Sequence, residues 1–240
     1  MADGTDASYP ELRARVALAC RVLGENGHSD LVWGHASARD PDGRGAWLKA
    51  SKLGFEEITR DDVLLVNADG EVQHGEGGLH VEYPIHTEIL LARPDVGGVV
   101  HSHPEHGVAL AAAGQKLLPV SHAANLFVPP DVPRYERTAD LITTRELGRE
   151  IAEAIGQHDA LFLVNHGIVT VGPDVETAAV RAIILERACA QQLLVKQHGG
   201  YPTWSPPEES LSKRRNIYHP AALRSVWDYL VRQLGDAAEV

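Results

Sequence analysis

The stretch Val-Gly-Gly-Val-Val-His-Ser-His-Pro, residues 96–104, gives the strongest structural signal in this chain. Its apolar run from Val96 to Val100 is typical of a strand; it leads into His101 and His103, and Pro104 terminates it. Side chains at positions i and i+2 of a strand point to the same face, so the two imidazoles can converge on one ion. Taken alone, the pair is more typical of exposed or hydrogen-bonded histidines than of a metal site.

A second apolar run ends in the same way. Residues 161–164 are followed by Asn165, His166 and Gly167. Imidazole is a common ligand of zinc, manganese and iron, and three protein ligands with an open position are typical of a catalytic metal site. The repeated context therefore favours a metal site formed by His101, His103 and His166.

Composition excludes several classes of protein. With 240 residues, 44% of them hydrophobic, the chain can bury one substantial core, and we expect a single domain over residues 1–240. The net charge of −11 argues against nucleic acid as a partner. No apolar stretch approaches the roughly 20 residues of a membrane span. Cys20 and Cys189 fall in helical patterns, so we expect buried thiols and a cytoplasmic protein.

The remaining pattern predicts an α/β fold, because helical and strand-like segments alternate. A strand is expected to begin at Leu31 and to end in a small-residue turn, Gly34 to Ser37. Residues 199–207 contain three prolines and two glycines and predict a loop. Helices are predicted at 10–25, 84–93, 109–113, 143–155, 175–197 and 220–234, and further strands at 47–50, 63–66, 161–164 and 169–171.

Glu82 precedes the helix predicted from Pro84 and stands one helical turn before His86. Its carboxylate is open to three interpretations: a general base, a metal ligand, or a charge favoured by the helix N-terminus. His86 alone is more typical of a hydrogen-bonded core residue.

Further polar side chains lie at the ends of predicted strands. These are His35, Ser51 with Lys52, and His122. Sites of α/β proteins form at such positions, although exposed loops are an equal alternative.

Several motifs together resemble the class II aldolase/adducin-like family. The resemblance runs in the family's order from about Leu12 to Gln197 and rests on Glu82-x3-His86, Arg93-Pro94-Asp95, Val100-His101-Ser102-His103-Pro104 and Asn165-His166-Gly167. It implies a three-layer α/β/α sandwich with a central, mostly antiparallel sheet, usually assembled as a tetramer with active sites at subunit interfaces.

The same resemblance implies a cofactor. His101, His103 and His166 would hold one divalent metal ion per subunit, manganese or zinc in the first place, with iron or cobalt as alternatives. Glu82 would be the acid/base or a swinging ligand.

Departures from the family pattern bear on the substrate. Sugar-phosphate members carry an asparagine where this chain has His35, and a serine pair where it has His80 and Val81. His35, His122 and Lys52 suit a carboxylate or phenolate better than a phosphate, through charge-assisted hydrogen bonds. In this respect the chain resembles the branch with decarboxylases of hydroxylated aromatic or pyridine carboxylic acids.

The expected function is therefore a metal-dependent carbon–carbon lyase, most simply a decarboxylase acting through an enolate. Glu82 would deliver the proton, while His35, Ser51 and Lys52 would hold a second carboxylate or hydroxyl of a small-molecule substrate. The alternatives are an aldolase for a phosphorylated or unphosphorylated hydroxy-ketone, an iron oxygenase, and a non-catalytic adducin-like interaction domain. The three histidines and the glutamate, all present, argue against the last.

Residues 198–240 are expected to form a strap and a helix at a subunit interface. An apolar stripe on this helix would pack on a neighbouring subunit of a cyclic tetramer, and Tyr218 or Arg214 would reach toward an adjacent active site. The stripe consists of Leu223, Trp227, Leu230 and Val231.

Overall fold

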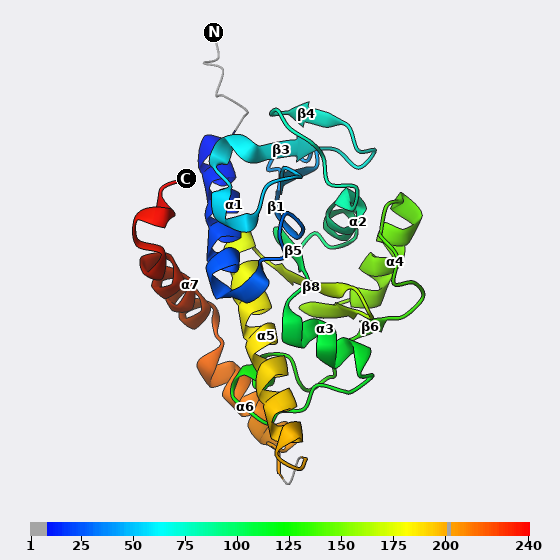
Figure 1. Ribbon diagram of the computed structural model, residues 1–240, viewed down its shortest axis with the longest axis vertical. Coiled ribbons are helices and arrows are strands. Elements are labelled where there is room, and N and C mark those ends of the chain that lie inside the picture. Colours follow the sequence, from blue (N-terminus) through cyan, green and yellow to red (C-terminus); the bar gives the residue numbers. More distant parts are fainter. Residues whose placement is uncertain (1–8, 201–202) are drawn as a thin grey trace.

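The computed structural model describes residues 9–200 and 203–240, and within them eight strands form one sheet in the order β4-β3-β2-β1-β5-β8-β7-β6 (Figure 1). Every neighbouring pair is antiparallel except β6 with β7. The strands are β1 (His35–Arg39), β2 (Ala46–Lys49), β3 (Val63–Val66), β4 (Val72–His74), β5 (Gly98–Ser102), β6 (Arg134–Tyr135), β7 (Ala160–Leu163) and β8 (Gly167–Gly172).

Helices cover both faces of this sheet (Figure 1). One face packs against α2 and α4, the other against α1, α3 and α5, and α7 packs on α1 and α5. The expected three-layer α/β/α sandwich with a mostly antiparallel sheet is confirmed. The helices are α1 (Pro10–Leu23), α2 (Tyr83–Ala92), α3 (Glu105–Ala112), α4 (Arg145–Ile155), α5 (Val175–Gln197), α6 (Pro207–Ile217) and α7 (Pro220–Leu234).

Side chains alternate along the central strands between two apolar clusters. On β5, Val100 joins the cluster under α1 and α5, whereas Val99 joins the one under α2 and α4. Because His101 is two residues from Val99, it faces α2. Gly98 allows the start of α5 to approach this strand, since a Cβ there would lie 2.4 Å from Val175 Cα.

Our prediction of a strand that begins at Leu31 is wrong. Leu31 is exposed in a turn with φ 53°, and the strand begins only at His35. The segment that we interpreted as a small-residue turn is a central strand buried on both faces. The small side chains of Ala36 and Ala38 point to one face of the sheet and leave room there for α1 and α5, so their size reflects packing and not a turn.

Two further expectations need correction at the C-terminal end. Part of the predicted loop is helical, since α6 begins at Pro207, a residue type well suited to the first turn of a helix. We expected the apolar stripe of α7 to pack on a neighbouring subunit. Its residues Leu223, Trp227 and Leu230 are instead buried against α1 and α5 of the same chain.

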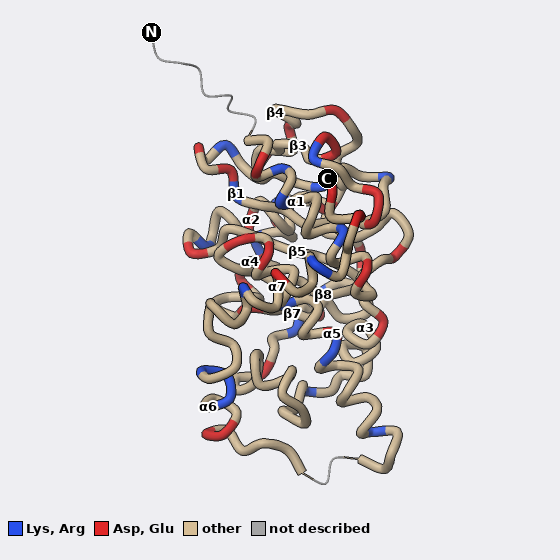
Figure 2. Tube along the Cα trace, turned by 90° about the vertical axis from the view of Figure 1, so that its left-hand side faces the viewer, with Lys and Arg blue, Asp and Glu red and all other residues tan. Residues whose placement is uncertain are grey.

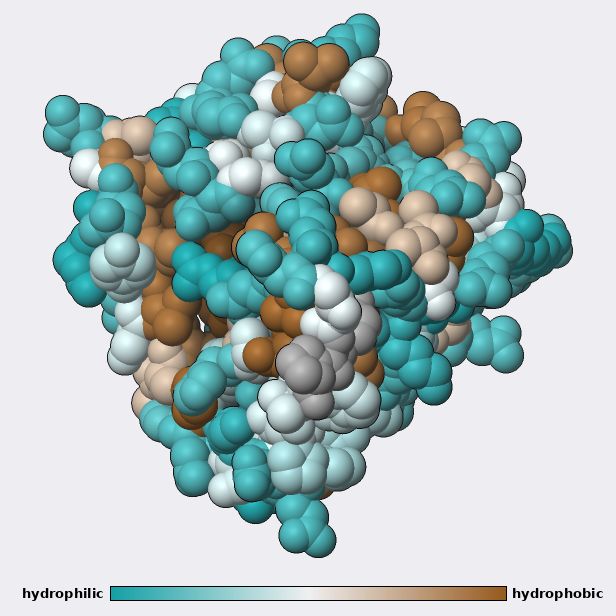
Figure 3. All heavy atoms as spheres, turned by 60° about the horizontal axis from the view of Figure 1, so that its bottom comes forward, coloured by the Kyte–Doolittle hydropathy of each residue, from teal (hydrophilic) through white to brown (hydrophobic). Residues whose placement is uncertain are grey.

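The surface is mixed in character. Basic and acidic positions are interspersed along the trace (Figure 2), and apolar side chains emerge in hollows at the end formed by α6 and the last turns of α5 (Figure 3). Among the described residues, no helix combines the length and apolar character needed to cross a bilayer. Cys20 and Cys189 are buried and unpaired, as expected.

Candidate metal centre and active site

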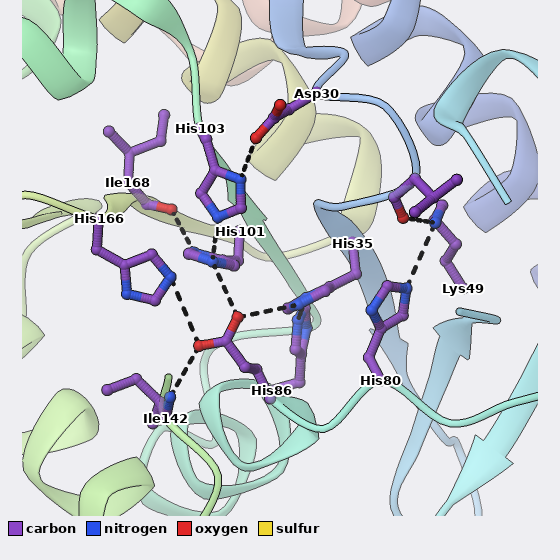
Figure 4. A network of polar contacts seen from close by, with 12 residues as sticks. Asp30, His35, Lys49, His80, His86, His101, His103, Ile142, His166 and Ile168 are labelled. Carbon is purple, nitrogen blue, oxygen red and sulfur yellow. Dashed lines mark hydrogen bonds and ion pairs between the residues drawn. The ribbon is translucent and has the colours of Figure 1, made fainter. Parts of the chain in front are cut away.

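Glu82, His101, His103 and His166 converge at one point (Figure 4), where one ligand atom from each lies within 4.8 Å of the others. Glu82 Oε2 lies 3.7 Å from His101 Nε2, and Glu82 Oε1 lies 3.5 Å from His166 Nε2. The fold thus brings together the residues that the sequence analysis grouped.

Backbone constraints at two elements position the histidines. His101 is the last residue but one of β5, and the chain then leads His103 onto the same side. His166 sits in the turn between β7 and β8, beside Asn165 in the left-handed region (φ 59°). Glycine is required next, because a Cβ at Gly167 would lie 2.6 Å from the carbonyl oxygen of Ser102 and 2.7 Å from the His103 ring. The Asn165-His166-Gly167 sequence therefore allows the turn between β7 and β8 to pack closely against His101 and His103.

Glu82 occupies the N-cap position of α2 but makes no capping hydrogen bond. Its Oε1 instead accepts from the backbone N–H of Ile142 at 2.8 Å. Burial alone would raise the pKa of this carboxyl, but the contacts with His101 and His166 and the Ile142 N–H outweigh burial and hold the pKa well below its ordinary value. An ionised carboxylate beside imidazoles is suited to bind a cation or to accept a proton.

A second hydrogen bond fixes the tautomers of His101 and His103, whereas Nδ1 of His166 is buried without a partner among the described residues. His101 Nδ1–H donates to the carbonyl oxygen of Ile168 at 2.9 Å, and His103 Nδ1–H donates to Asp30 Oδ2 at 2.9 Å. In the neutral rings, both Nε2 atoms then carry lone pairs, yet they face each other at 3.1 Å. Two facing lone pairs need a cation between or beside them, so this donor set fits a divalent metal, and Asp30 and Ile168 orient the ligands.

A cavity of about 610 Å³ opens onto the cluster. Part of its wall is apolar, and its lining, drawn from the described residues, contains neither lysine nor arginine. The lining residues are Asp30, Trp33, Gly34, His35, His80, Val81, Glu82, His103, Glu105, Val108, Leu141, Asn165 and His166.

The expected substrate-binding set is only partly found at this cavity. His35 lines it, whereas Ser51, Lys52, His122 and Tyr218 are absent from the described lining. Lys52 is exposed in a turn with φ 69°. Tyr218 donates its hydroxyl proton to the carbonyl oxygen of His122, 2.9 Å away, within the same chain.

Ser51 is held elsewhere by backbone pairing. Its N–H donates to the carbonyl oxygen of Gly78 at 2.8 Å, in the segment that leads to Glu82. Arg214 is likewise engaged within the chain, donating to the carbonyl oxygens of Asn125 and Pro129 at 2.9 and 2.7 Å. The interpretation of Ser51 and Lys52 as a rim around the substrate therefore finds no support in the cavity of one chain.

Sequence reasoning missed several residues near the site. His80 lines the cavity, and its Nε2 lies 3.4 Å from Nζ of the fully buried Lys49. Burial lowers the pKa of the Lys49 ammonium. Asp30, the partner of His103, went unnoticed because it directly precedes the segment that we predicted as a strand and belongs to none of the motifs. A signal existed for His80, which lies two residues before Glu82.

An α/β/α sandwich in which three imidazoles and a carboxylate converge beside a cavity is a framework that could hold a metal ion next to a small molecule. The chain belongs to the class II aldolase/adducin family: residues 14–193 match the family model described as the class II aldolase and adducin N-terminal domain.

Two curated relatives share about a third of their aligned residues with the chain. A 3,4-dihydroxyphthalate decarboxylase of Arthrobacter keyseri is 32% identical over 204 residues, covering 78% of this chain and 80% of the relative. A 4-hydroxy-3-prenylphenylpyruvate oxygenase/4-hydroxy-3-prenylbenzoate synthase of Streptomyces roseochromogenus is 33% identical over 201 residues, covering 80% and 72%.

Among solved structures, the L-fuculose 1-phosphate aldolase of Glaciozyma antarctica superposes with a TM-score of 0.83 at 26% identity, covering 96% of this chain and 92% of the aldolase. The named relatives thus include carbon–carbon lyases of two kinds and an oxygenase.

Proposed function

We propose that this protein is a divalent-metal-dependent decarboxylase of a hydroxylated aromatic or heteroaromatic carboxylic acid. The observation that carries the proposal is the character of the cavity: the His–Glu cluster adjoins apolar walls that include Trp33, Val81 and Leu141, and the described residues that line it include no lysine or arginine. Apolar walls favour an aromatic ring, and a phosphate dianion would lack a cationic side chain. The similarity to a 3,4-dihydroxyphthalate decarboxylase supports the same substrate class.

His101, His103 and His166 would hold the metal, with Glu82 as a fourth ligand or as the base beside it. Manganese or zinc is our first expectation, because imidazole and carboxylate together suit both. When bound, the metal supplies a Lewis acid that stabilises negative charge on a substrate oxygen next to the reacting carbon.

The side chain of Glu82 carries out the proton transfer of the proposed reaction. The ionised carboxylate of Glu82 accepts the proton of the substrate's ring hydroxyl, so the ring oxygen becomes anionic. Glu82 delivers this proton to the ring carbon that carries the carboxylate, and the ring oxygen becomes a carbonyl oxygen. The bond between that carbon and the carboxylate then breaks, carbon dioxide leaves, and the electron pair passes to the ring oxygen as a phenolate, which takes a proton from water.

Two alternatives rest on specific relatives. Aldol cleavage is supported by the similarity to the fuculose phosphate aldolase, and it would place the same charge on a carbon next to an oxygen. Oxygen chemistry at iron is supported by the relative named as an oxygenase, since three histidines leave positions open for dioxygen. A non-catalytic adducin-like domain would have no use for the intact His–Glu cluster.

The test begins with elemental analysis of the purified protein and of His101→Ala. We expect stoichiometric divalent metal in the wild type and most of it lost from the variant, with circular dichroism unchanged. Carbon dioxide release is then measured with ortho-hydroxy aromatic acids, 3,4-dihydroxyphthalate among them. Equal metal in both proteins overturns the metal site. Efficient cleavage of a sugar phosphate without carbon dioxide release replaces decarboxylation by aldol cleavage, and oxygen consumption by the iron-loaded protein replaces both.

We further propose a homo-oligomer, most simply a tetramer. Leu194 lies in the last turn of α5, Trp204 precedes α6 and Leu211 lies within α6, and their side chains are 53%, 51% and 37% exposed. Exposed apolar side chains of this size favour burial between subunits. Light scattering should give a multiple of the 26.0 kDa chain mass, and a fully active monomer would refute the assembly.

A further inference from the structure

Behind the candidate metal centre lies a row of three buried polar side chains, Ser37, His86 and His35. The Ser37 hydroxyl oxygen is 2.6 Å from His86 Nδ1, and His86 Nε2 is 2.6 Å from His35 Nδ1. His35 and Ser37 share the α2-facing side of β1, because they are two residues apart, and His86 comes from α2 itself. The other end of the row, His35 Nε2, lies at the cavity beside Glu82 (Figure 4).

The direction of these hydrogen bonds follows first from Ser37. Each contact joins two heavy atoms that share a single proton, so one donor at the start of the row determines the rest. Ser37 is fully buried, and among the described residues its hydroxyl has no hydrogen-bond partner other than His86. If His86 donated to Ser37, the hydroxyl proton would be buried without an acceptor, which costs roughly 1–3 kcal/mol. Ser37 therefore donates to His86 Nδ1, and His86 Nε2–H donates to His35 Nδ1.

The carboxylate at the other end supports the same direction. His35 Nε2 lies 4.0 Å from Glu82 Oε2. With Nδ1 accepting from His86, His35 carries its proton on Nε2, and this N–H faces the negative charge of Glu82. The opposite tautomer would set the Nε2 lone pair against that carboxylate. Because 4.0 Å is too long for a hydrogen bond, the N–H remains available to another acceptor.

We propose that Ser37 and His86 are positioning residues that hold His35 as an Nε2–H donor toward the cavity, where it binds a second anionic oxygen of the substrate. The inference rests on the proposed function and narrows the substrate to an aromatic acid with two acidic groups. One group reacts at the metal centre, and the other, a carboxylate or a phenolate, accepts the hydrogen bond of His35. A neutral N–H donor meets this oxygen where the described lining contains no lysine or arginine.

The first test is spectroscopic and does not depend on turnover. Nitrogen-15 NMR of the zinc-loaded protein with labelled histidine, assigned with His35→Gln and His86→Gln, reports which ring nitrogen carries the proton. We expect both His35 and His86 to be protonated on Nε2 and unprotonated on Nδ1. The reverse tautomer at either residue overturns the inference, whether or not the protein releases carbon dioxide.

The second test compares Ser37→Ala with Ser37→Thr, which retains the hydroxyl. Calorimetry measures binding of phthalate, which has two carboxylates, and of benzoate, which has one. We expect Ser37→Ala to weaken phthalate binding roughly 3- to 10-fold, the scale of one hydrogen bond, with benzoate much less affected and Ser37→Thr close to wild type. Equal losses for both acids in a folded Ser37→Ala protein contradict a role of the row in binding the second group.

Turnover separates this inference from the proposed function. If a dicarboxylic acid is decarboxylated, Ser37→Ala should raise its KM while kcat changes little, because the lost interaction holds ground state and transition state alike. If no acid is decarboxylated but the tautomers and the phthalate preference are as stated, the decarboxylase assignment falls and the anion-binding role of His35 remains.

Discussion

Replacing Asp30 tests whether the cluster is a metal centre with oriented ligands. Asp30 is not one of the four cluster residues. It contacts the cluster through His103, whose Nδ1–H donates to Asp30 at 2.9 Å (Figure 4). The His103 side chain is 17% exposed and that of Asp30 36%, so the pair is partly shielded from water. Losing such an outer partner typically lowers metal affinity 10- to 100-fold, which corresponds to about 1.4–2.7 kcal/mol.

We therefore expect Asp30→Ala to bind zinc or manganese roughly 10- to 100-fold more weakly than the wild type. Asp30→Asn should lose less, because its amide oxygen still accepts from Nδ1–H although the charge is gone. The measurement is a competition titration against a metal chelator at fixed pH. Asp61→Ala is the control, since the Asp61 side chain is 81% exposed, pairs with Arg13 and is not among the residues that line the cavity. Equal affinities of Asp30→Ala and wild type would show that Asp30 does not orient a ligand.

Three further predictions concern catalysis and stability. Glu82→Gln should retain metal but lower turnover roughly 100-fold or more, measured by carbon dioxide release; unchanged turnover would move proton transfer to another group. Asp174 caps α5 by accepting from the Thr177 N–H at 2.7 Å, so Asp174→Ala should lower the free energy of unfolding in urea by about 1 kcal/mol. Burial lowers the pKa of His28 from 6.5 to about 3. The unfolded chain therefore binds a proton below pH 6.5 that the folded chain rejects, and the free energy of unfolding falls as pH drops from about 6.5 to about 3, by about 2 kcal/mol at pH 5 from this group. His28→Gln should show a shallower pH dependence, and an identical slope would contradict this account.

The grouping of His101, His103 and His166 was predictable because it rests on local rules: strand periodicity and two apolar runs that end in the same way. The hydrogen-bonded row from Ser37 to His35 was not predictable from the sequence, because it depends on the position of α2 along the sheet and on the pairing of β1 with β5. His35 lies opposite His101 in that pairing, a register that no short motif encodes. The central position of β1 also explains why we predicted the strand to begin at Leu31 and not at His35. A strand that is covered on both faces lacks the alternation of apolar and polar residues that marks a strand with one exposed face.

The sign of the charge in the cavity has a kinetic consequence. Asp30, Glu82 and Glu105 line it, without lysine or arginine in the described lining, and the whole chain carries a net charge of −11. An anionic aromatic acid of the proposed class would meet a repulsive potential at the metal-free protein, so the proposed reaction would require the metal to bind first and the acid second. Added salt screens that repulsion, and the association rate of the acid should therefore rise with ionic strength, the reverse of an enzyme that attracts its anionic substrate through basic side chains.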